Sequence, residues 1–191
     1  MKISLIISQV IFILLFPVWL ELTKYLHWIV IAVVWFCYSF LVVFVVCLVN
    51  QVTISFNKRL LSIVTAAYSA SLLILLLLRP NDDHGSSNLV PFETISFYLS
   101  GKVDFLIAFY NLGANIALFI PFGLYYKYVN RKPSPWRILI YTLLCISLIE
   151  ITQFVTHRGS LDIDDLILNT AGVFTGFVLY PLFQKVFKMI E

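Results

Sequence analysis

The stretch that decides the fold runs from Ile138 to Val155, ILIYTLLCISLIEITQFV, and contains one charged residue, Glu150. An apolar run of this length is typical of a membrane-spanning helix. The segment that follows, HRGSLDIDDLILNTAG (157–172), gathers a histidine, an arginine and three aspartates. A turn between two membrane helices does not need three aspartates, so this segment is either a helix cap or part of a functional site.

The composition of the whole chain suits a bilayer better than water. Hydrophobic residues make up 61% of the sequence and charged residues 12%, whereas a soluble domain carries roughly a quarter charged residues. The net charge of +3 and the absence of a basic run do not indicate nucleic-acid binding. The sequence also lacks a glycine-rich phosphate-binding motif, so no nucleotide is expected as a partner. Cys37, Cys47 and Cys145 have no zinc-site spacing, and no metal site is assigned.

The apolar runs predict an all-α, polytopic membrane protein with six transmembrane helices. The predicted spans are residues 3–20, 28–49, 60–78, 106–126, 137–157 and 163–184. With the N-terminus inside, nine of the thirteen Lys and Arg residues lie on the inner side, as the positive-inside rule favours. Both termini are therefore expected inside (N-in/C-in), and the segment 157–162 is expected outside.

Three regions are expected along the chain. Residues 1–78 hold the first three transmembrane helices and act as a scaffold. Residues 79–105 form an extracytoplasmic loop whose second half is amphipathic, and we expect a short interfacial helix or a re-entrant piece there. Residues 85–182 carry the motifs and include helices four to six.

Polar residues within the last three spans fall on single helix faces, and such residues usually face the interior of a helix bundle. They are Asn111 and Asn115 in the fourth span, Glu150, Gln153 and His157 in the fifth, and Asp162, Asp165 and Asn169, with Gly172 and Gly176, in the sixth. At 1.5 Å per helical residue, Glu150 and Asn169 both lie roughly 10 Å below the outer helix ends. The three faces therefore predict a polar pocket that opens outward.

The residue types suggest roles in such a pocket. The candidate catalytic residues are Glu150, Asp162 and Asp165, and the candidate substrate-binding residues are Asn88, Asn115, Gln153, Arg158 and Asn169. Glu150 suits a general acid or base, and the planar guanidinium of Arg158 suits a phosphate or carboxylate. Asp162 and Asp165 suit a divalent cation or a sugar hydroxyl. The sequence identifies no cofactor.

Each of these residues also has a plain structural explanation. Asp162 suits the N-cap of the last helix, and Asp164 and Asp165 favour the positive end of its dipole. The two asparagines of the fourth span suit interhelical hydrogen bonds. His157 suits a solvated helix end.

With these residues in place, the chain resembles the VanZ-like family of bacterial membrane proteins. The resemblance covers roughly residues 85–182 and rests on NLVPF (88–92), NIALFIPFGL (115–124), EITQF (150–154) and the D-x-x-D-x-x-x-N-T-x-G run (162–172). The residues that match the family's pattern are Asn88, Pro91, Phe92, Asn115, Pro121, Phe122, Gly123, Glu150, Gln153, Asp162, Asp165, Asn169 and Gly172.

The resemblance implies a multi-pass protein of the bacterial cytoplasmic membrane that acts at the cell envelope. The founding member of the family is associated with resistance to the lipoglycopeptide antibiotic teicoplanin, and most members have no assigned activity. Many members carry an arginine at the place of Arg158, whereas the teicoplanin-associated type lacks it. The resemblance therefore places this chain with the broader group.

Three hypotheses follow. In the first, an outward-facing polar pocket binds or acts on a cell-envelope lipid or peptidoglycan precursor and affects glycopeptide (teicoplanin) susceptibility. In the second, the protein is a non-catalytic membrane accessory or structural protein whose polar cluster only holds helices five and six together. In the third, it is a small transporter, although no inverted repeat is visible. Whether the protein is an enzyme stays open.

Overall fold

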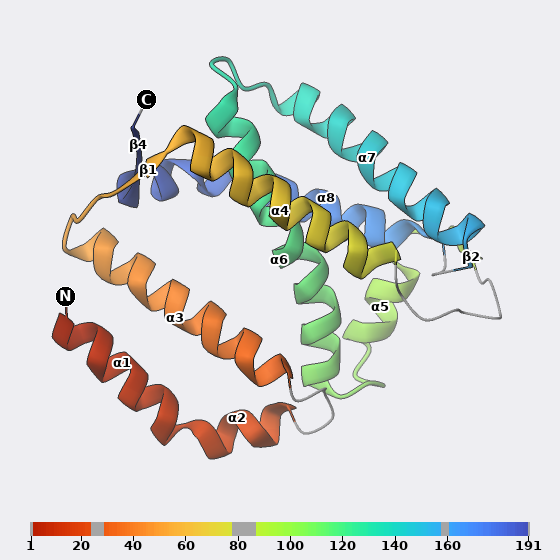
Figure 1. The fold of residues 1–191 in the computed structure, drawn as a ribbon. Coiled ribbons are helices and arrows are strands. Elements are labelled where there is room, and N and C mark those ends of the chain that lie inside the picture. Colours follow the sequence, from red (N-terminus) through yellow and green to blue (C-terminus); the bar gives the residue numbers. More distant parts are fainter. Residues whose placement is uncertain (1, 24–28, 78–86, 158–160, 191) are drawn as a thin grey trace. The chain divides into compact units, whose positions relative to one another are not determined.

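The computed structural model describes residues 2–23, 29–77, 87–157 and 161–190, most of them in α-helices (Figure 1). The helices are α1 (Lys2–Leu14), α2 (Phe16–Thr23), α3 (Ile29–Val49), α4 (Lys58–Leu77), α5 (Glu93–Leu99), α6 (Phe105–Val129), α7 (Pro135–Val155) and α8 (Ile163–Val186). The short strands are β1 (Ile54–Asn57), β2 (Ser87–Asn88), β3 (Leu161–Asp162) and β4 (Phe187–Ile190). The chain forms two compact units, Met1–Phe56 with Leu182–Glu191, and Asn57–Pro181.

Among the described residues, α6, α7 and α8 are long and apolar enough to cross a membrane. A shorter apolar stretch, Trp35–Val49, lies in α3. The three long helices coincide with predicted spans four to six, and the predicted ranges of the first three spans are also largely helical. The structure thus confirms a helical protein with several candidate membrane spans, while the number six and the N-in/C-in orientation stay predictions.

In the first unit, the predicted span 3–20 is divided between α1 and α2 at Leu15. Pro17 lies two residues further on, and a proline inside a helix removes a backbone donor and disturbs the preceding turn. α1 packs against α3, where Gln9 accepts a hydrogen bond from the Trp35 indole at 2.8 Å and donates one to Ser39 at 3.2 Å. A separate apolar cluster in this unit centres on the buried residues Cys47, Val186 and Phe187, near the pairing of β1 with β4.

The second unit has a core between its long helices. Its buried members come from α4, α6, α7 and α8, and they are Leu72, Phe119, Ile138, Ile146 and Val173. Helix α6 begins at the cap residue Asp104, whose carboxylate accepts the Leu106 N–H at 2.9 Å. Helix α7 begins at Ser134 with Pro135 in its first turn, a position where proline costs no hydrogen bond.

Helices α6 and α8 approach each other through glycines. A Cβ added at Gly176 would lie 3.0 Å from the backbone nitrogen of Leu124 and even closer to the carbonyl oxygen of Ile120. One added at Gly172 would meet the carbonyl oxygen of Ile116, and one at Gly123 that of Val173. Small residues of this kind let membrane helices pack backbone to backbone. The contact fixes α8 against α6 just beyond the candidate site.

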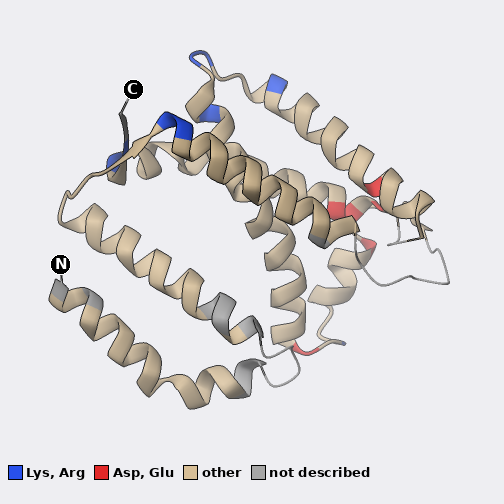
Figure 2. Ribbon diagram, viewed as in Figure 1, with Lys and Arg blue, Asp and Glu red and all other residues tan. Residues whose placement is uncertain are grey.

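Charge is separated along the helices of the second unit (Figure 2). Lys58 and Arg59 begin α4, Lys127 lies near the end of α6 and Arg137 lies in the first turn of α7. Figure 2 shows these basic residues at one end of α4, α6 and α7, and the acidic residues of α7 and α8 at the other. The candidate site lies at the acidic end.

Candidate functional site

The site begins with two short strands that lie side by side. β2 pairs in parallel with β3, with Ser87 opposite Leu161 and Asn88 opposite Asp162. β3 leads directly into α8, and β2 leads through the turn at residues 89–92 into α5. The pairing therefore brings the NLVPF segment onto the beginning of α8.

Asp162 is the centre of the contacts between these segments. Its Oδ1 accepts the backbone N–H of Asp164 at 2.9 Å, which confirms the predicted cap at the start of α8. Its Oδ2 accepts the hydroxyl of Thr94 at 2.8 Å, and its Oδ1 also lies 3.4 Å from the amide nitrogen of Asn88. The amide of Asn88 donates in addition to Thr94 at 2.9 Å. The carboxylate of Asp162 thus caps α8 and also binds the segment that contains Asn88 and Thr94.

Asp164 is fully buried, with no exposed surface, and it holds the start of α5. Its Oδ1 accepts the backbone N–H of Phe92 at 2.6 Å and its Oδ2 that of Ile95 at 3.1 Å. Phe92 has a φ of +68°, which is uncommon for a residue other than glycine. The carboxylate therefore replaces the missing helical partners of α5 and stabilises a strained backbone just before it.

Asp165 joins α8 to α6. Its Oδ1 accepts the side-chain amide of Asn115 at 2.6 Å. Asn111, one turn earlier on α6, instead donates to the carbonyl of Ile107 in its own helix at 2.8 Å. The predicted interhelical role is therefore confirmed for Asn115, while the described hydrogen bond of Asn111 stays within α6.

Glu150 and Gln153 connect α7 to its neighbours. Glu150 is buried, and its Oε2 accepts the backbone N–H of Asp162 at 3.4 Å. Gln153 is 3% exposed and donates its amide to the carbonyl of Leu76, near the end of α4, at 2.8 Å. Glu150 thus contacts the backbone just before α8, whereas Gln153 faces α4, and the meeting of the α7 and α8 polar faces stays a prediction.

Asn169 lies deeper along α8. It is 5% exposed, and its Oδ1 is buried without a hydrogen-bond partner among the described residues. It shares the face of α8 that carries Asp165 and Gly172. A buried carbonyl oxygen without a donor is costly, so this position favours a bound water or a polar ligand group.

A cavity of about 460 Å³ adjoins these contacts. Its lining residues are Ser87, Asn88, Glu93, Thr94, Phe97 and Tyr98. Asn88 and Thr94 belong both to the cavity wall and to the hydrogen bonds of Asp162. The described lining does not include Glu150, Asp165 or Asn169.

Arg158 and His157 follow α7 in the sequence. Arg158 lies outside the described residues, and His157 is exposed with a φ of +54° at the end of α7.

Across the described parts of the chain, no three His, Cys, Asp or Glu side chains are grouped to hold a metal ion. The suggested sharing of a divalent cation between Asp162 and Asp165 has no such group to support it.

Sequence reasoning did not place Asp164, Thr94, Glu93, Phe97 or Tyr98 in the site. Asp164 lies off the polar stripe of α8 because helical spacing puts its neighbours Asp162 and Asp165 on another face. Its partners are backbone N–H groups, which leave no signal in a sequence. The amphipathic pattern of α5 did predict a short helix there, which the structure confirms.

Comparisons with known proteins agree on one family. A family model described as VanZ/LLP1 matches residues 34–184, and its match begins well before the motif-bearing half of the chain. Protein VanZ of Enterococcus faecium is 43% identical over 72 residues, which are 37% of this chain and 44% of that protein. The match thus spans less than half the length of this curated relative. No solved structure matches the chain.

Proposed function

This chain belongs to the VanZ/LLP1 family, and from that premise and the geometry at the start of α8 we propose that it binds a cell-envelope lipid or peptidoglycan precursor. The binding site is the cavity beside Asn88 and Thr94, on the outer side of the bacterial cytoplasmic membrane. Through that ligand the protein affects susceptibility to glycopeptides such as teicoplanin.

The observation that carries the proposal is the double role of Asn88 and Thr94. Both line the cavity, and both are held in place by hydrogen bonds that lead to the carboxylate of Asp162. Polar groups fixed in this way are preorganised, so little conformational entropy is lost when a ligand binds. A loop that only connected two helices would not need its polar groups fixed toward a cavity.

The lining suits a polar, hydroxyl-rich headgroup. Glu93 offers a carboxylate acceptor, Phe97 and Tyr98 offer aromatic rings, and the oxygen atoms of Asn88 and Thr94 keep lone pairs as acceptors beside their bonds within the protein. A few placed polar groups beside apolar rings are typical of sites that bind small molecules. The sugars and the peptide of a precursor carry the hydroxyl and amide groups that such a site recognises.

The positions of the acidic residues favour binding over catalysis. Glu150 and Asp165 hold neighbouring helices and are not among the described residues that line the cavity. Their assignment as catalytic residues, with Asp162, therefore stays a prediction. A general acid or base has to reach the proton that it transfers, directly or through one water.

A second candidate function rests on a specific observation. Asp164 and Gln153 direct their hydrogen bonds to backbone groups of α5 and α4. This is what an accessory membrane protein needs if its polar cluster only holds the helices together. The two functions differ in whether the side chains on the cavity wall matter beyond stability.

The test compares cavity residues with a neighbour on the same helix. Glu93→Gln, Phe97→Ala and Tyr98→Phe each change the cavity wall, and Leu99→Ala changes an exposed side chain of α5 that is not part of the lining. All are expressed in a teicoplanin-sensitive bacterium, with membrane abundance measured beside the inhibitory concentration. We expect the cavity variants to lose the phenotype at normal abundance and Leu99→Ala to retain it. A phenotype that follows abundance alone supports the accessory function instead.

A further inference from the structure

An apolar groove of about 270 Å³ lies in the second unit, apart from the cavity described above. Its sides are α4 and α7, with Leu72 and Leu73 on one and Tyr141 and Cys145 on the other. Phe119 and Val173 close its base from α6 and α8. Tyr141 and Cys145 are exposed, so the groove is open along its length.

The length of the groove matches a hydrocarbon chain. It follows α7 from Ile138 to Ile149, a distance of about 16 Å at 1.5 Å per residue. One leaflet of a bilayer has a hydrocarbon region of about 15 Å, half of the usual 30 Å core. The groove therefore offers a path about as long as one extended lipid chain.

Other occupants fit poorly. A volume of about 270 Å³ spread over this length is too narrow for a further helix, whose diameter with side chains is about 10–12 Å. An extended peptide would bring unpaired N–H and C=O groups to membrane depth. Ordered water would need several polar partners, and most of the described lining is apolar.

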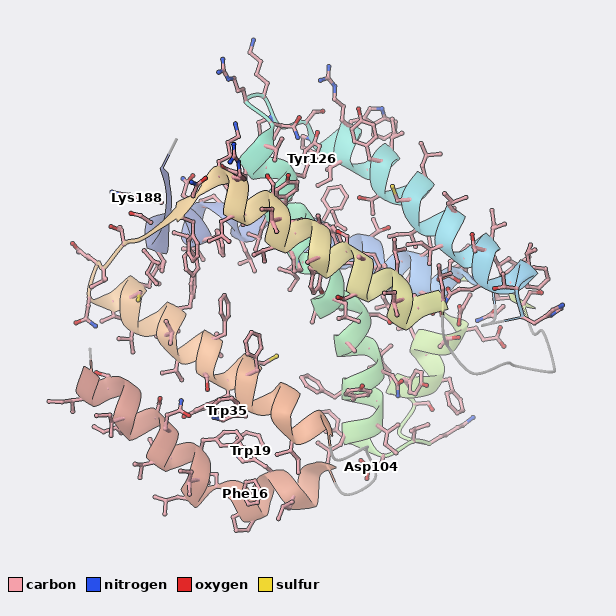
Figure 3. All side chains as sticks on the ribbon, viewed as in Figure 1. Phe16, Trp19, Trp35, Asp104, Tyr126 and Lys188 are labelled. Carbon is pink, nitrogen blue, oxygen red and sulfur yellow. The ribbon has the colours of Figure 1, made fainter. Side chains whose placement is uncertain are left out.

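The two ends of the groove also suit a lipid. Ile149 precedes the buried Glu150, and beyond it the hydrogen bond from Gln153 to Leu76 ties α7 to α4. Toward the opposite end lies Tyr126 (Figure 3), and its ring meets that of Tyr141 edge to face with 6.5 Å between the ring centroids. One end of the groove thus reaches the polar cluster, and the other ends at an aromatic pair.

We propose that this groove holds one hydrocarbon chain of a membrane lipid, so that the ligand whose headgroup enters the cavity at Asn88 and Thr94 is an amphiphile anchored between α4 and α7. The proposal rests on the proposed function for the headgroup only. Chain binding depends on apolar contact along the groove and on no particular headgroup.

The test uses the full chain in nanodiscs of phosphatidylcholine doped with phosphatidylcholine that carries a diazirine in one acyl chain. After irradiation, peptide mapping locates the adducts. A carbene inserts more readily into O–H and S–H bonds than into C–H bonds, so like residues are compared. We expect severalfold more adducts at Tyr141 than at the exposed Tyr110, and at Cys145 than at the exposed Cys37, neither of which is in the described lining. Equal labelling within each pair would mean ordinary surrounding lipid and would overturn the inference.

Filling the groove gives the matched variants. Cys145→Phe narrows it from α7, Ser69→Leu narrows it from α4, and Leu148→Phe places a phenyl ring of the same size on another face of α7. We expect each of the first two to reduce adducts at Tyr141 severalfold and Leu148→Phe to leave them unchanged, with thermal unfolding reporting that each variant is folded. An unchanged yield in a folded Cys145→Phe or Ser69→Leu variant contradicts chain binding.

The headgroup is tested separately. Glu93→Gln alters the cavity wall but not the groove, so we expect it to change teicoplanin susceptibility and not the adduct pattern. If susceptibility is unchanged while the adducts stay in the groove, the proposed function fails and chain binding holds. If the adducts spread evenly while susceptibility changes, chain binding fails and the headgroup site holds.

Discussion

The carboxylate of Asp164 lies 2.6 Å from the backbone nitrogen of Phe92 and ties the start of α8 to the start of α5. The same carboxylate accepts the N–H of Ile95 at 3.1 Å, and its side chain has no exposed surface. The loop that forms the cavity is therefore held by a residue that does not touch the cavity. This arrangement separates the residues needed for stability from those available to a ligand.

Asp164→Ala is expected to destabilise the protein strongly. It removes the acceptor of two backbone N–H groups, and each hydrogen bond to a charged group contributes about 1.5–3 kcal/mol. We therefore expect the free energy of unfolding in detergent to fall by about 3 kcal/mol or more. Asp104→Ala removes an exposed aspartate cap from α6 and should cost about 1 kcal/mol. Equal losses for the two variants would contradict the bracing role of Asp164.

Asn115 and Asp165 are expected to be coupled in a double-mutant cycle. Their hydrogen bond of 2.6 Å joins α6 to α8, and bonds of this kind between membrane helices contribute about 0.6 kcal/mol, with a maximum of about 1.7. Unfolding of the two alanine variants and of the double variant measures the coupling. Asn111 bonds within its own helix. The losses in free energy of unfolding caused by Asn111→Ala and by Asp165→Ala should therefore sum to that of the double variant within about 0.5 kcal/mol. If the losses caused by Asn115→Ala and Asp165→Ala are also additive, the hydrogen bond between these residues does not stabilise the contact of α6 with α8.

Gly176→Ala is expected to separate α6 from α8. The added methyl group would meet the backbone of Ile120 and Leu124, and overpacking of this kind costs about 1–3 kcal/mol. Gly113, also in α6, has no atom within 4 Å of an added Cβ, so Gly113→Ala should be neutral or stabilising by up to about 1 kcal/mol. Thermal unfolding and membrane abundance of the two variants test the contact. If Gly176→Ala leaves stability and abundance unchanged, the close contact of α6 with α8 is not needed for stability.

The sequence predicted the long helices because their limits have local causes. Ser134 with Pro135 begins α7, Asp162 begins α8, and long apolar runs separate these signals. Helical spacing and a short connection also predicted that Glu150 lies near the start of α8, and the structure places its carboxylate on the backbone N–H of Asp162. These features depend on neighbours in sequence, where periodicity and capping chemistry are informative.

Contacts across the fold were less accessible to sequence reasoning. Gln153 was assigned to a ligand, but its described partner is the backbone of Leu76. Asp164 was attributed to the dipole of its own helix, but its carboxylate binds α5. In both cases the partner is a peptide group, and every residue but proline offers the same N–H and C=O. Only the arrangement of the helices decides which of these backbone groups a side chain contacts.

The orientation of the chain is expected to place the cavity outside the cell. Basic residues begin α4 and α7 and lie near the end of α6, and acidic residues lie near the end of α7 and at the start of α8 (Figure 2), so the positive-inside rule places the start of α8 outside. Ser160→Cys, between α7 and α8, should react with a membrane-impermeant maleimide on intact cells, and the exposed Asn130→Cys, between α6 and α7, should react only after lysis. The unsubstituted chain gives the background from its three native cysteines. The opposite labelling pattern would put the cavity in the cytoplasm and remove a direct route to an envelope precursor on the outer surface.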